Sequence, residues 1–448
     1  MTRLLLRNFR EVPDVALSAS GIRIRSADGR EVIDGSGGAA VACLGHAHPA
    51  VLEAIRRQIE KVCYVHTGFY VGEPVEALAE HLVGHEPGGL THAYFVSSGS
   101  EGVETAIKLA RQYALETGQP QREHVIGRRQ SYHGNTLGAL GAGGNLVRRP
   151  PYAPILPQAS SHVSPCYPYR EQRAGEDDAA YVKRLADELE AEFQRIGPNR
   201  VMAFIAEPVV GATLGCQAAL PGYFKAVREI CDRHGALLIL DEVMCGLGRT
   251  GTLHAWEQEG VAPDIQVIAK GLGGGYQPIG GILAAGRVVE AIRAGSGIHR
   301  HGHTYAAHPV ACAAALAVQQ VIHEENLVEQ VAIRGRQLET ALKRRLGQHP
   351  NVGDIRGRGL FWAMELVEDR ETKTPFAPEL GMNGRVKLAT YARGLACYPV
   401  GGTIDGVRGD HVLLAPPYIT TEDEIETIAD LMAAGIDDAV KGLPRSAT

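Results

Sequence analysis

The sequence predicts an α/β fold with a mostly parallel central sheet, helices on both faces of that sheet, and a smaller α+β domain beside it. From residue 92 onward, apolar strand-like runs alternate with amphipathic helix-like segments, which is the order that builds a parallel sheet. The strand-like runs, such as residues 201–206, are continuously apolar, so both faces of each strand are expected to be covered. With 448 residues, the chain is long enough for two domains or more.

Local patterns predict the individual elements. Residues 20–36 predict a β-hairpin that turns at Asp28-Gly29, and Pro49 is expected to begin a helix. Strands are expected at 92–98, 124–129, 200–207, 236–243 and 264–270, and helices at 100–116, 178–196 and 221–235. Residues 140–175 have no periodicity and predict a long loop. An Ala-rich helix is expected after residue 310, and the smaller domain from about residue 325.

Composition narrows the class of protein. The net charge is −6 and no basic block is present, which argues against nucleic acid or an anionic membrane as the main partner. The eight cysteines form no C-x-x-C pair, so no zinc knuckle or redox motif is indicated, and their scatter is typical of a reducing compartment. The opening residues have too short an apolar run for a signal peptide, and no run reaches membrane-spanning length. A soluble cytoplasmic protein is therefore expected.

Polar residues follow the first strand of the predicted sheet, at the point where a helix begins. Ser98 and Glu101 match a capping box, and Gly99 lies between two serines. The free N–H groups of a helix N-terminus, together with the hydroxyls of Ser98 and Ser100, suit a phosphate group. The alternative is an ordinary helix cap, which is the commoner role for such a segment.

Two further strands end in charged residues. The run ALLIL is followed by Asp241, and a buried Asp needs a cationic partner, which a protonated ring nitrogen can supply. The run DIQVIA is followed by Lys270, and desolvation turns a buried lysine into a nucleophile by lowering its pKa. The alternatives are that Asp241 caps the next turn and that Lys270 extends to solvent.

Aromatic and acidic residues follow two other strands. Tyr132 and His133 come after the strand at 124–129, and Glu207 ends the strand at 200–207. Tyr132 can stack on a planar cofactor, although core packing is the alternative. The carboxyl ends of parallel strands meet at one edge of a sheet, so the phosphate site, the acid, the flat side chain and the lysine are expected together. This combination predicts a pocket for pyridoxal 5′-phosphate.

At these residues the sequence resembles the class III aminotransferases of the ω-amino acid or amine:pyruvate type, which are fold-type-I pyridoxal-phosphate-dependent transferases. The resemblance extends from about residue 20 to about residue 435. The matching segments are SGSE (98–101), ETAIKLAR (104–111), YHG (132–134), EPV (207–209), DEVMCGLGRTG (241–251), DIQVIAKGLGGGYQPIG (264–280) and HGHTYAAHP (301–309).

The resemblance implies a role for each of these segments. Lys270 would carry the cofactor as an imine and move a proton during catalysis, and Asp241 would pair with the ring nitrogen. Val243 and Tyr132 would flank the ring. The complete set that the resemblance places around the cofactor is Ser98, Gly99, Ser100, Tyr132, His133, Glu207, Asp241, Val243, Lys270 and Thr304.

The resemblance also implies an assembly and a domain division. Thr304 would reach the phosphate bound by the neighbouring subunit, so a homodimer with shared active sites is expected. The large cofactor-binding domain would span residues 57–325. The small domain would combine residues 1–56 with residues 326–448.

The resemblance predicts transfer of an amino group from an ω-amino acid or primary amine to a keto acid, with pyruvate as the acceptor, by a ping-pong mechanism. Met244 and Val210 stand where glutamate-using members carry Gln, and DEVMCG is closer to the DEVICG of members that use amines with pyruvate. Ala39 and Ala40 stand where some amine transaminases have a large aromatic, which predicts a roomier pocket.

Tyr70 and Arg408 are the candidate substrate-binding residues. Arg148 and Arg149, in the segment 140–175, are alternatives for binding a substrate carboxylate.

Other functions remain as alternatives. The same pocket could support a decarboxylase, a racemase or an aminomutase, or the fold could serve a non-catalytic binding protein. His299, His301, His303 and His308 have no Cys or carboxylate beside them, so no metal is expected. The GLGGG run follows a lysine and does not match G-x-G-x-x-G, which argues against a dinucleotide-binding dehydrogenase.

Overall fold

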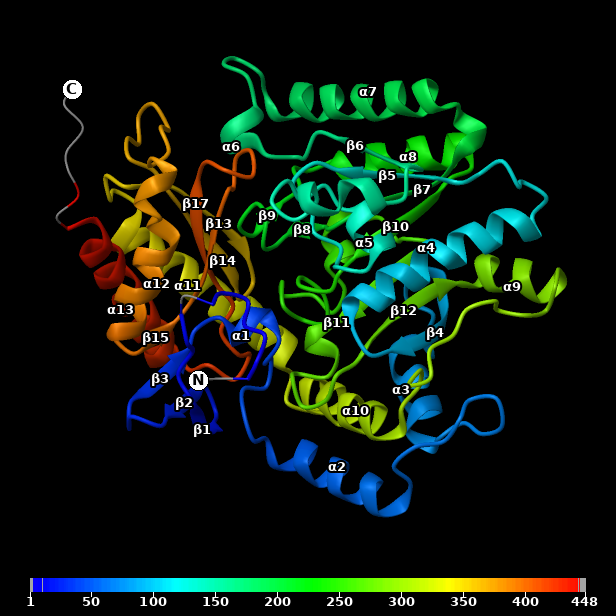
Figure 1. Cartoon of the computed structure of the whole chain (residues 1–448), viewed down its shortest axis with the longest axis horizontal. Helices are drawn as coiled ribbons and strands as arrows, with labels where there is room; N and C mark the ends of the chain where they lie inside the picture. Colours follow the sequence, from blue (N-terminus) through cyan, green and yellow to red (C-terminus); the bar gives the residue numbers. More distant parts are fainter. Residues whose placement is uncertain (1–2, 10, 442, 444–448) are drawn as a thin grey trace.

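The computed structural model describes residues 3–9, 11–441 and 443, and Figure 1 shows their arrangement. The middle of the chain forms a large α/β unit around a seven-stranded sheet. The N-terminal and C-terminal segments lie together on the other side of the molecule, where they form two four-stranded sheets.

The central sheet is mostly parallel, as the sequence predicts. Strand β12 runs antiparallel to both of its neighbours, and the other strand pairs are parallel. In spatial order the strands are β4 (Leu90–Val96), β12 (Gly280–Ala285), β11 (Ile265–Ala269), β10 (Leu237–Asp241), β7 (Val201–Ala206), β5 (His124–Arg128) and β6 (Ser160–Val163).

Helices cover both faces of this sheet because successive strand residues point to opposite sides. In β10, Leu237 and Ile239 pack in one apolar cluster, whereas Leu238 and Leu240 pack in another. The first cluster includes residues from α3 (Glu73–Val83), α4 (Gly99–Glu116), α5 (Leu137–Ala142), α9 (Gly286–Ala294) and α10 (Pro309–Glu324). The second cluster includes residues from α7 (Asp178–Ile196) and α8 (Tyr223–His234).

The smaller unit joins the two ends of the chain. One sheet contains β1 (Ala16–Ser20), β2 (Arg23–Ser26), β3 (Glu31–Asp34) and β15 (Leu395–Ala396). The other contains β13 (Val352–Arg358), β14 (Phe361–Leu366), β17 (Asp410–Leu414) and β16 (Tyr398–Gly401). The α-helices that contribute no residue to the two apolar clusters of the large unit are α1 (Gly37–Ala40), α2 (Pro49–Lys61), α6 (Pro168–Glu171), α11 (Leu327–Leu346), α12 (Met382–Ala392) and α13 (Glu422–Val440). A separate two-stranded sheet pairs β8 (Val209–Val210) with β9 (Gln217–Ala218).

The parallel pairing of β3 with β15 ties the N-terminal hairpin to the C-terminal segment. We propose that this pairing reflects a large domain at 57–325 and a small domain formed by 1–56 and 326–448. The boundary at residue 57 would then lie inside α2, which packs against α10 of the large unit.

Two strands of the central sheet differ from the sequence prediction. Residues 140–175 are not one long loop, because they contain β6 at the edge of the sheet and the helix α6. Strand β6 has the sequence SSHV and is only partly buried, so it lacks the apolar run of a central strand. Strand β12 begins with two glycines, which sequence patterns associate with turns.

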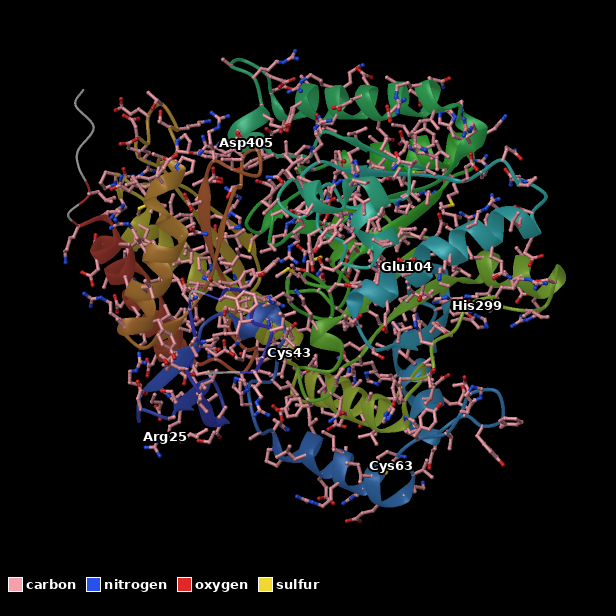
Figure 2. All side chains as sticks on the ribbon, in the orientation of Figure 1. Arg25, Cys43, Cys63, Glu104, His299 and Asp405 are labelled. Atoms are coloured by element: carbon pink, nitrogen blue, oxygen red, sulfur yellow. The ribbon has the colours of Figure 1, made fainter. Side chains whose placement is uncertain are left out.

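Two general features of the chain bear on its environment. All eight cysteines are free thiols, and Figure 2 shows buried Cys43 and exposed Cys63 in separate parts of the molecule. Among the helices that the structure describes, none combines the length and apolar character needed to cross a bilayer.

Gly280 is expected to be essential for the position of the residues after β4. It begins β12 between β4 and β11, and a Cβ atom there would lie 2.5 Å from the backbone carbonyl carbon and oxygen of Ser98. We expect Gly280→Ala to lower stability by about 1–3 kcal/mol, the usual cost of overpacking. Gly384→Ala in α12 is the control, because its added methyl meets nothing within 4 Å. Thermal unfolding followed by circular dichroism should show a lower midpoint for the first variant only, and equal midpoints would contradict this packing argument.

Candidate active site

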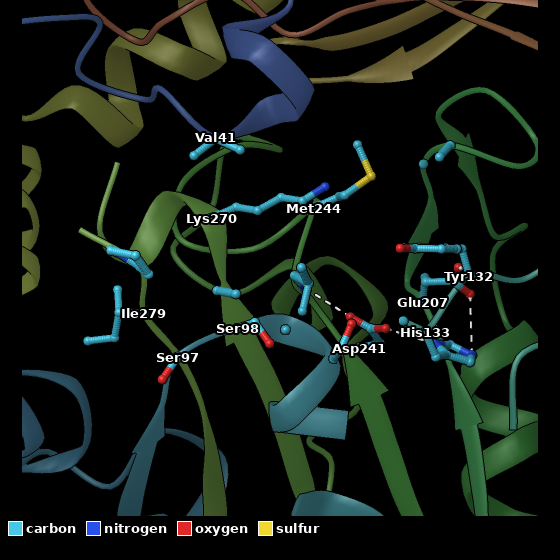
Figure 3. A pocket seen from close by; sticks show the side chains of 18 of the residues that line it. Val41, Ser97, Ser98, Tyr132, His133, Glu207, Asp241, Met244, Lys270 and Ile279 are labelled. Atoms are coloured by element: carbon cyan, nitrogen blue, oxygen red, sulfur yellow. Dashed lines mark hydrogen bonds and ion pairs between the residues drawn. The ribbon is translucent and has the colours of Figure 1, made fainter. Parts of the chain in front are cut away.

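A cavity of about 400 Å³ lies beyond the carboxyl ends of β4, β5, β7, β10 and β11, where open α/β sheets bind ligands. It brings together nearly all the residues that the sequence analysis assigned to the cofactor (Figure 3). Those that line it are Ser98, Gly99, Ser100, Tyr132, His133, Glu207, Asp241, Val243 and Lys270.

The N-terminus of α4 forms one wall of this cavity. Ser98 caps the helix, and its hydroxyl accepts a hydrogen bond from the N–H of Glu101 at 3.2 Å. In a capping box the Glu101 carboxylate would accept a hydrogen bond from the N–H of Ser98. Here it accepts from the N–H of Ser97 at 2.7 Å, one residue earlier than predicted. The first N–H groups of the helix, at Gly99 and Ser100, have no intrahelical acceptor and remain at the cavity wall. This wall is suited to an anion.

Asp241 and His133 form a buried pair on the floor of the cavity. Asp241 is 3% exposed, and its Oδ1 accepts from the N–H of Val243 at 3.0 Å. His133 Nδ1 donates to Asp241 Oδ2 at 2.7 Å. Burial alone would lower the pKa of His133, but the charge of Glu207 and the hydrogen bond and charge of Asp241 outweigh it and raise the pKa. The pair therefore holds the Asp241 carboxylate in one orientation (Figure 3).

Glu207 connects the floor of the cavity to the segment that carries Tyr132. Its Oε1 accepts from the N–H of Tyr132 at 3.0 Å, and its Oε2 lies 3.4 Å from the guanidinium of Arg128. Arg128 is 1% exposed and also donates to the Glu207 carbonyl at 2.6 Å. A buried arginine is stable only with such partners, so this ion pair fixes Glu207.

Lys270 crosses the cavity on the side opposite to Asp241, toward Met244 (Figure 3). It follows β11 directly and has a φ of +48°, a left-handed conformation that is uncommon for a residue with a side chain. Burial lowers the pKa of the Lys270 amine to about 8; Arg249 adds to the shift, and the Asp241 charge opposes it. A larger share of the amine is therefore neutral near physiological pH than for an ordinary lysine.

The second acid of the Asp241-Glu242 pair has a structural role. Glu242 does not line the cavity, and it accepts from the N–H groups of Ala255 and Trp256 at 2.8 and 2.7 Å. Gln266 Nε2 also donates to it at 2.9 Å. Burial raises the pKa of Glu242 to about 8, although the two backbone donors oppose that shift.

These residues fit pyridoxal phosphate. The wall at α4 can hold a phosphate, Asp241 can pair with a ring nitrogen, and Lys270 offers an amine of lowered pKa. At Gly99 a Cβ atom would lie 3.0 Å from both methyl groups of Val243, so glycine lets the first turn of α4 pack this closely against Val243.

The structure does not bring the remaining sequence-predicted residues into this cavity. Thr304 is exposed, and its carbonyl accepts from Tyr64 Oη at 3.0 Å. Tyr70 is 68% exposed. Arg408 is exposed and pairs with Asp405 at 2.7 Å on the loop between β16 and β17, where Figure 2 labels Asp405.

A second cavity of about 310 Å³ adjoins the first. The two share Tyr132, Ala212, Met244 and Lys270. The second cavity is also lined by Ala39, which the sequence analysis expected in a roomier pocket, and by Arg148.

Several lining residues were not selected from the sequence. Val41, Gln277 and Ile279 line the first cavity but carry no chemical signal in the sequence. Arg128 did carry a signal, since a charged residue stands within an otherwise buried strand.

The histidines near residue 300 pack against one another and against α4. His301 bonds Thr105 Oγ1 at 2.9 Å and packs between His299 and His303. Within the described part of the chain, no group of three or more His, Cys, Asp or Glu is arranged to hold a metal ion.

Comparisons with known proteins give the family. The family model described as aminotransferase class-III matches residues 8–436. An uncharacterized aminotransferase of Schizosaccharomyces pombe is 49% identical over 432 residues, covering 96% of this chain and 94% of that protein. A solved (S)-enantioselective omega-transaminase from Thermomicrobium roseum is 36% identical, with a TM-score of 0.89 over 96% of this chain and 94% of that one. An omega-transaminase of Pseudomonas jessenii in complex with PMP is 31% identical, with a TM-score of 0.91 over 97% and 94%.

These matches confirm the fold class, the cofactor and the enzyme class that the sequence predicts. The family model and the solved relatives both extend over nearly the whole chain. The chain therefore belongs to the class III aminotransferases, a family of pyridoxal-phosphate-dependent enzymes.

Proposed function

We propose that this aminotransferase moves an amino group from an ω-amino acid or a primary amine to a keto acid, with pyruvate as the acceptor, by a ping-pong mechanism. The observation that carries the proposal is that Lys270, Asp241 and the N-terminus of α4 line one cavity. The two solved relatives that are described as omega-transaminases support the donor class. Met244, which lines both cavities where glutamate-using members carry Gln, supports pyruvate.

We assign the cofactor-holding roles from this geometry. Pyridoxal phosphate, when bound, supplies an aldehyde for the amine and a protonated ring that accepts electrons from the reacting carbon. Ser98, Gly99 and Ser100 would hold its phosphate through N–H and hydroxyl groups. Tyr132 and Val243 would enclose the ring from its two faces.

Asp241 would hold the proton on the ring nitrogen. His133 orients the Asp241 carboxylate through the 2.7 Å contact, and Glu207 keeps the neighbouring backbone of Tyr132 in place. In a buried cavity this fixed charge acts at short range with little solvent screening.

Lys270 would act twice. Its neutral amine would hold the cofactor, and the same nitrogen would move a proton to and from the substrate carbon. Its lowered pKa matches both roles, because a group of pKa about 8 can accept and release a proton near neutral pH.

We further propose a cytoplasmic homodimer. Phe69, Tyr70 and Tyr305 are 82%, 68% and 61% exposed, and Tyr64 links their two segments through its bond to the Thr304 carbonyl. Exposed aromatic side chains are typical of protein interfaces. The second copy would cover them, and the partner's Thr304 would complete the phosphate site. The free cysteines support a reducing compartment.

Substrate class is tested by a half-reaction screen. We expect ω-amino acids and primary amines, added alone to the cofactor-loaded enzyme, to convert the cofactor absorbance to that of its amino form, and pyruvate to restore it. A response to glutamate alone would contradict the amine–pyruvate assignment. Release of carbon dioxide or racemised amino acid without conversion of the cofactor would instead favour a decarboxylase or racemase.

The pH dependence of cofactor attachment tests the role of Lys270. Attachment needs the neutral amine, and the lowered pKa means that this form appears at lower pH than for an ordinary lysine. The rate of attachment to the apoprotein should therefore rise as the pH approaches about 8 and level off above it, instead of rising toward 10.5. Stopped-flow absorbance measures this rate. Lys270→Ala should lack the covalent phase, and a rate that keeps climbing toward 10.5 would argue against a desolvated amine.

Replacing the carboxylate tests the role of Asp241. Asp241→Asn keeps the shape and can keep the contact with the Val243 N–H, but it removes the charge. We expect the half-reaction to slow by about a hundredfold or more, as when a fixed electrostatic group is lost from an active site. Stopped-flow kinetics of the loaded enzyme measures the change. Asp405→Asn, on the loop between β16 and β17 and outside both cavities, is the control, and equal rates for the two variants would refute the proposed pairing.

A further inference from the structure

Among the described residues, the charged side chains that line the second cavity are all basic. Lys270 lies at its junction with the first cavity, and Arg7 and Arg148 also line it. Its lining, within the described residues, includes no Asp or Glu. A cleft lined by charges of one sign concentrates ligands of the opposite sign, so this cavity favours an anion.

Arg148 is held in a fixed position at this cavity. Its guanidinium carbon lies 5.0 Å from the centre of the Tyr132 ring, and its Nη1 donates to Asn135 Oδ1 at 3.1 Å. Asn135 in turn donates to Tyr132 Oη at 3.0 Å, and the Arg148 backbone N–H donates to Asn145 Oδ1 at 3.0 Å. These contacts are with neutral groups, and within the described residues Arg148 forms no ion pair with a carboxylate.

The side chains of the other two candidate arginines, Arg149 and Arg408, already have hydrogen-bond or ion-pair partners within the protein. Arg149 Nη1 donates to the carbonyls of Leu140, Gly141 and Gly143 at 2.7, 2.6 and 2.6 Å, so it supports the turn after α5. Arg408 is paired with Asp405 at 2.7 Å and lines neither cavity. Of the three, Arg148 is the one that lines a cavity and has no acidic partner among the described residues.

We propose that Arg148 binds the carboxylate of the substrate, and that the enzyme therefore prefers amino acids and keto acids over amines that lack a carboxylate. This inference rests on the proposed function. The reacting carbon must lie near Lys270, and the carboxylate near Arg148, and both residues line the same cavity. Arginine suits this role because its planar fork can bind both carboxylate oxygens. Stacking on Tyr132 limits the side-chain entropy that is lost on binding.

The experiment compares two donors that differ in the carboxylate, 4-aminobutyrate and n-butylamine. Stopped-flow half-reaction rates are measured for the wild type, Arg148→Gln, Arg148→Lys and Arg408→Gln. Exposed Arg200, which pairs with Glu123, gives the charge control Arg200→Gln. In parallel, calorimetry measures the binding of butyrate, an unreactive carboxylate, to each loaded enzyme.

We expect the wild type to prefer 4-aminobutyrate. In Arg148→Gln the specificity constant for 4-aminobutyrate should fall about tenfold to a hundredfold, the range for a hydrogen bond to a charged group, and that for n-butylamine should fall by much less. Butyrate affinity should fall in parallel. Arg148→Lys should be intermediate, because it keeps the charge and loses the fork.

Other outcomes would overturn the inference. An equal loss with both donors would show that Arg148 acts through Tyr132 alone. A selective loss in Arg408→Gln would move the carboxylate site to Arg408, and the absence of any wild-type preference would remove the need for such a site. Failure of both donors to react would refute the proposed function, whereas butyrate binding would still test Arg148 separately.

Discussion

The buried pairing of Asp241 with His133 is the constraint on which the rest of the site depends. A carboxylate that is 3% exposed requires fixed partners, and it finds them in the Val243 N–H and in His133 Nδ1. His133 in turn owes its raised pKa in part to Glu207, which is held by Arg128. Four charged or polar groups, from β5, β10, the residue after β7 and the turn after β5, therefore hold one another in place. Removing any one of them would leave a buried group without its partner, which costs more than the contact itself contributes.

Lys270 lies on the opposite side of the cavity from Asp241, and holding it there costs the protein conformational stability. It stands directly after a buried strand, with a φ of +48° and an amine whose pKa is lowered to about 8 by burial. Neither feature stabilises the protein, since left-handed backbone and a desolvated amine both carry a cost. The glycines around it allow this geometry: β12 begins with Gly280, which lets the turn at Ser98 and the end of β11 approach each other. Strain and desolvation at one position, supported by close packing around it, are typical of a catalytic group.

The sequence predicted the sheet edge well because that edge is built from strong local signals. Apolar runs that stop just before Ser97, Asp241 and Lys270 define both the strands and the point where they end. It failed for β6 and β12, whose short polar or glycine-rich sequences gain their strand conformation from pairing with neighbours that are far apart in the chain. It also overlooked Arg128, although a charge inside an apolar strand indicates a buried partner, here Glu207.

The carboxylate-binding arginine shows why substrate residues are harder to predict than cofactor residues. Arg148 and Arg149 are adjacent and chemically identical, and no pattern in the sequence separates them. The tertiary structure does: the Arg149 side chain donates to three carbonyls at the end of α5 and in the turn after it, and the Arg148 side chain lies on Tyr132 at a cavity that a distant strand, β16, helps to line. The cofactor requires one fixed set of chemical groups at the ends of the strands, so those groups are visible in the sequence. A substrate pocket needs only a charge at the right place, which loops from several parts of the chain can supply.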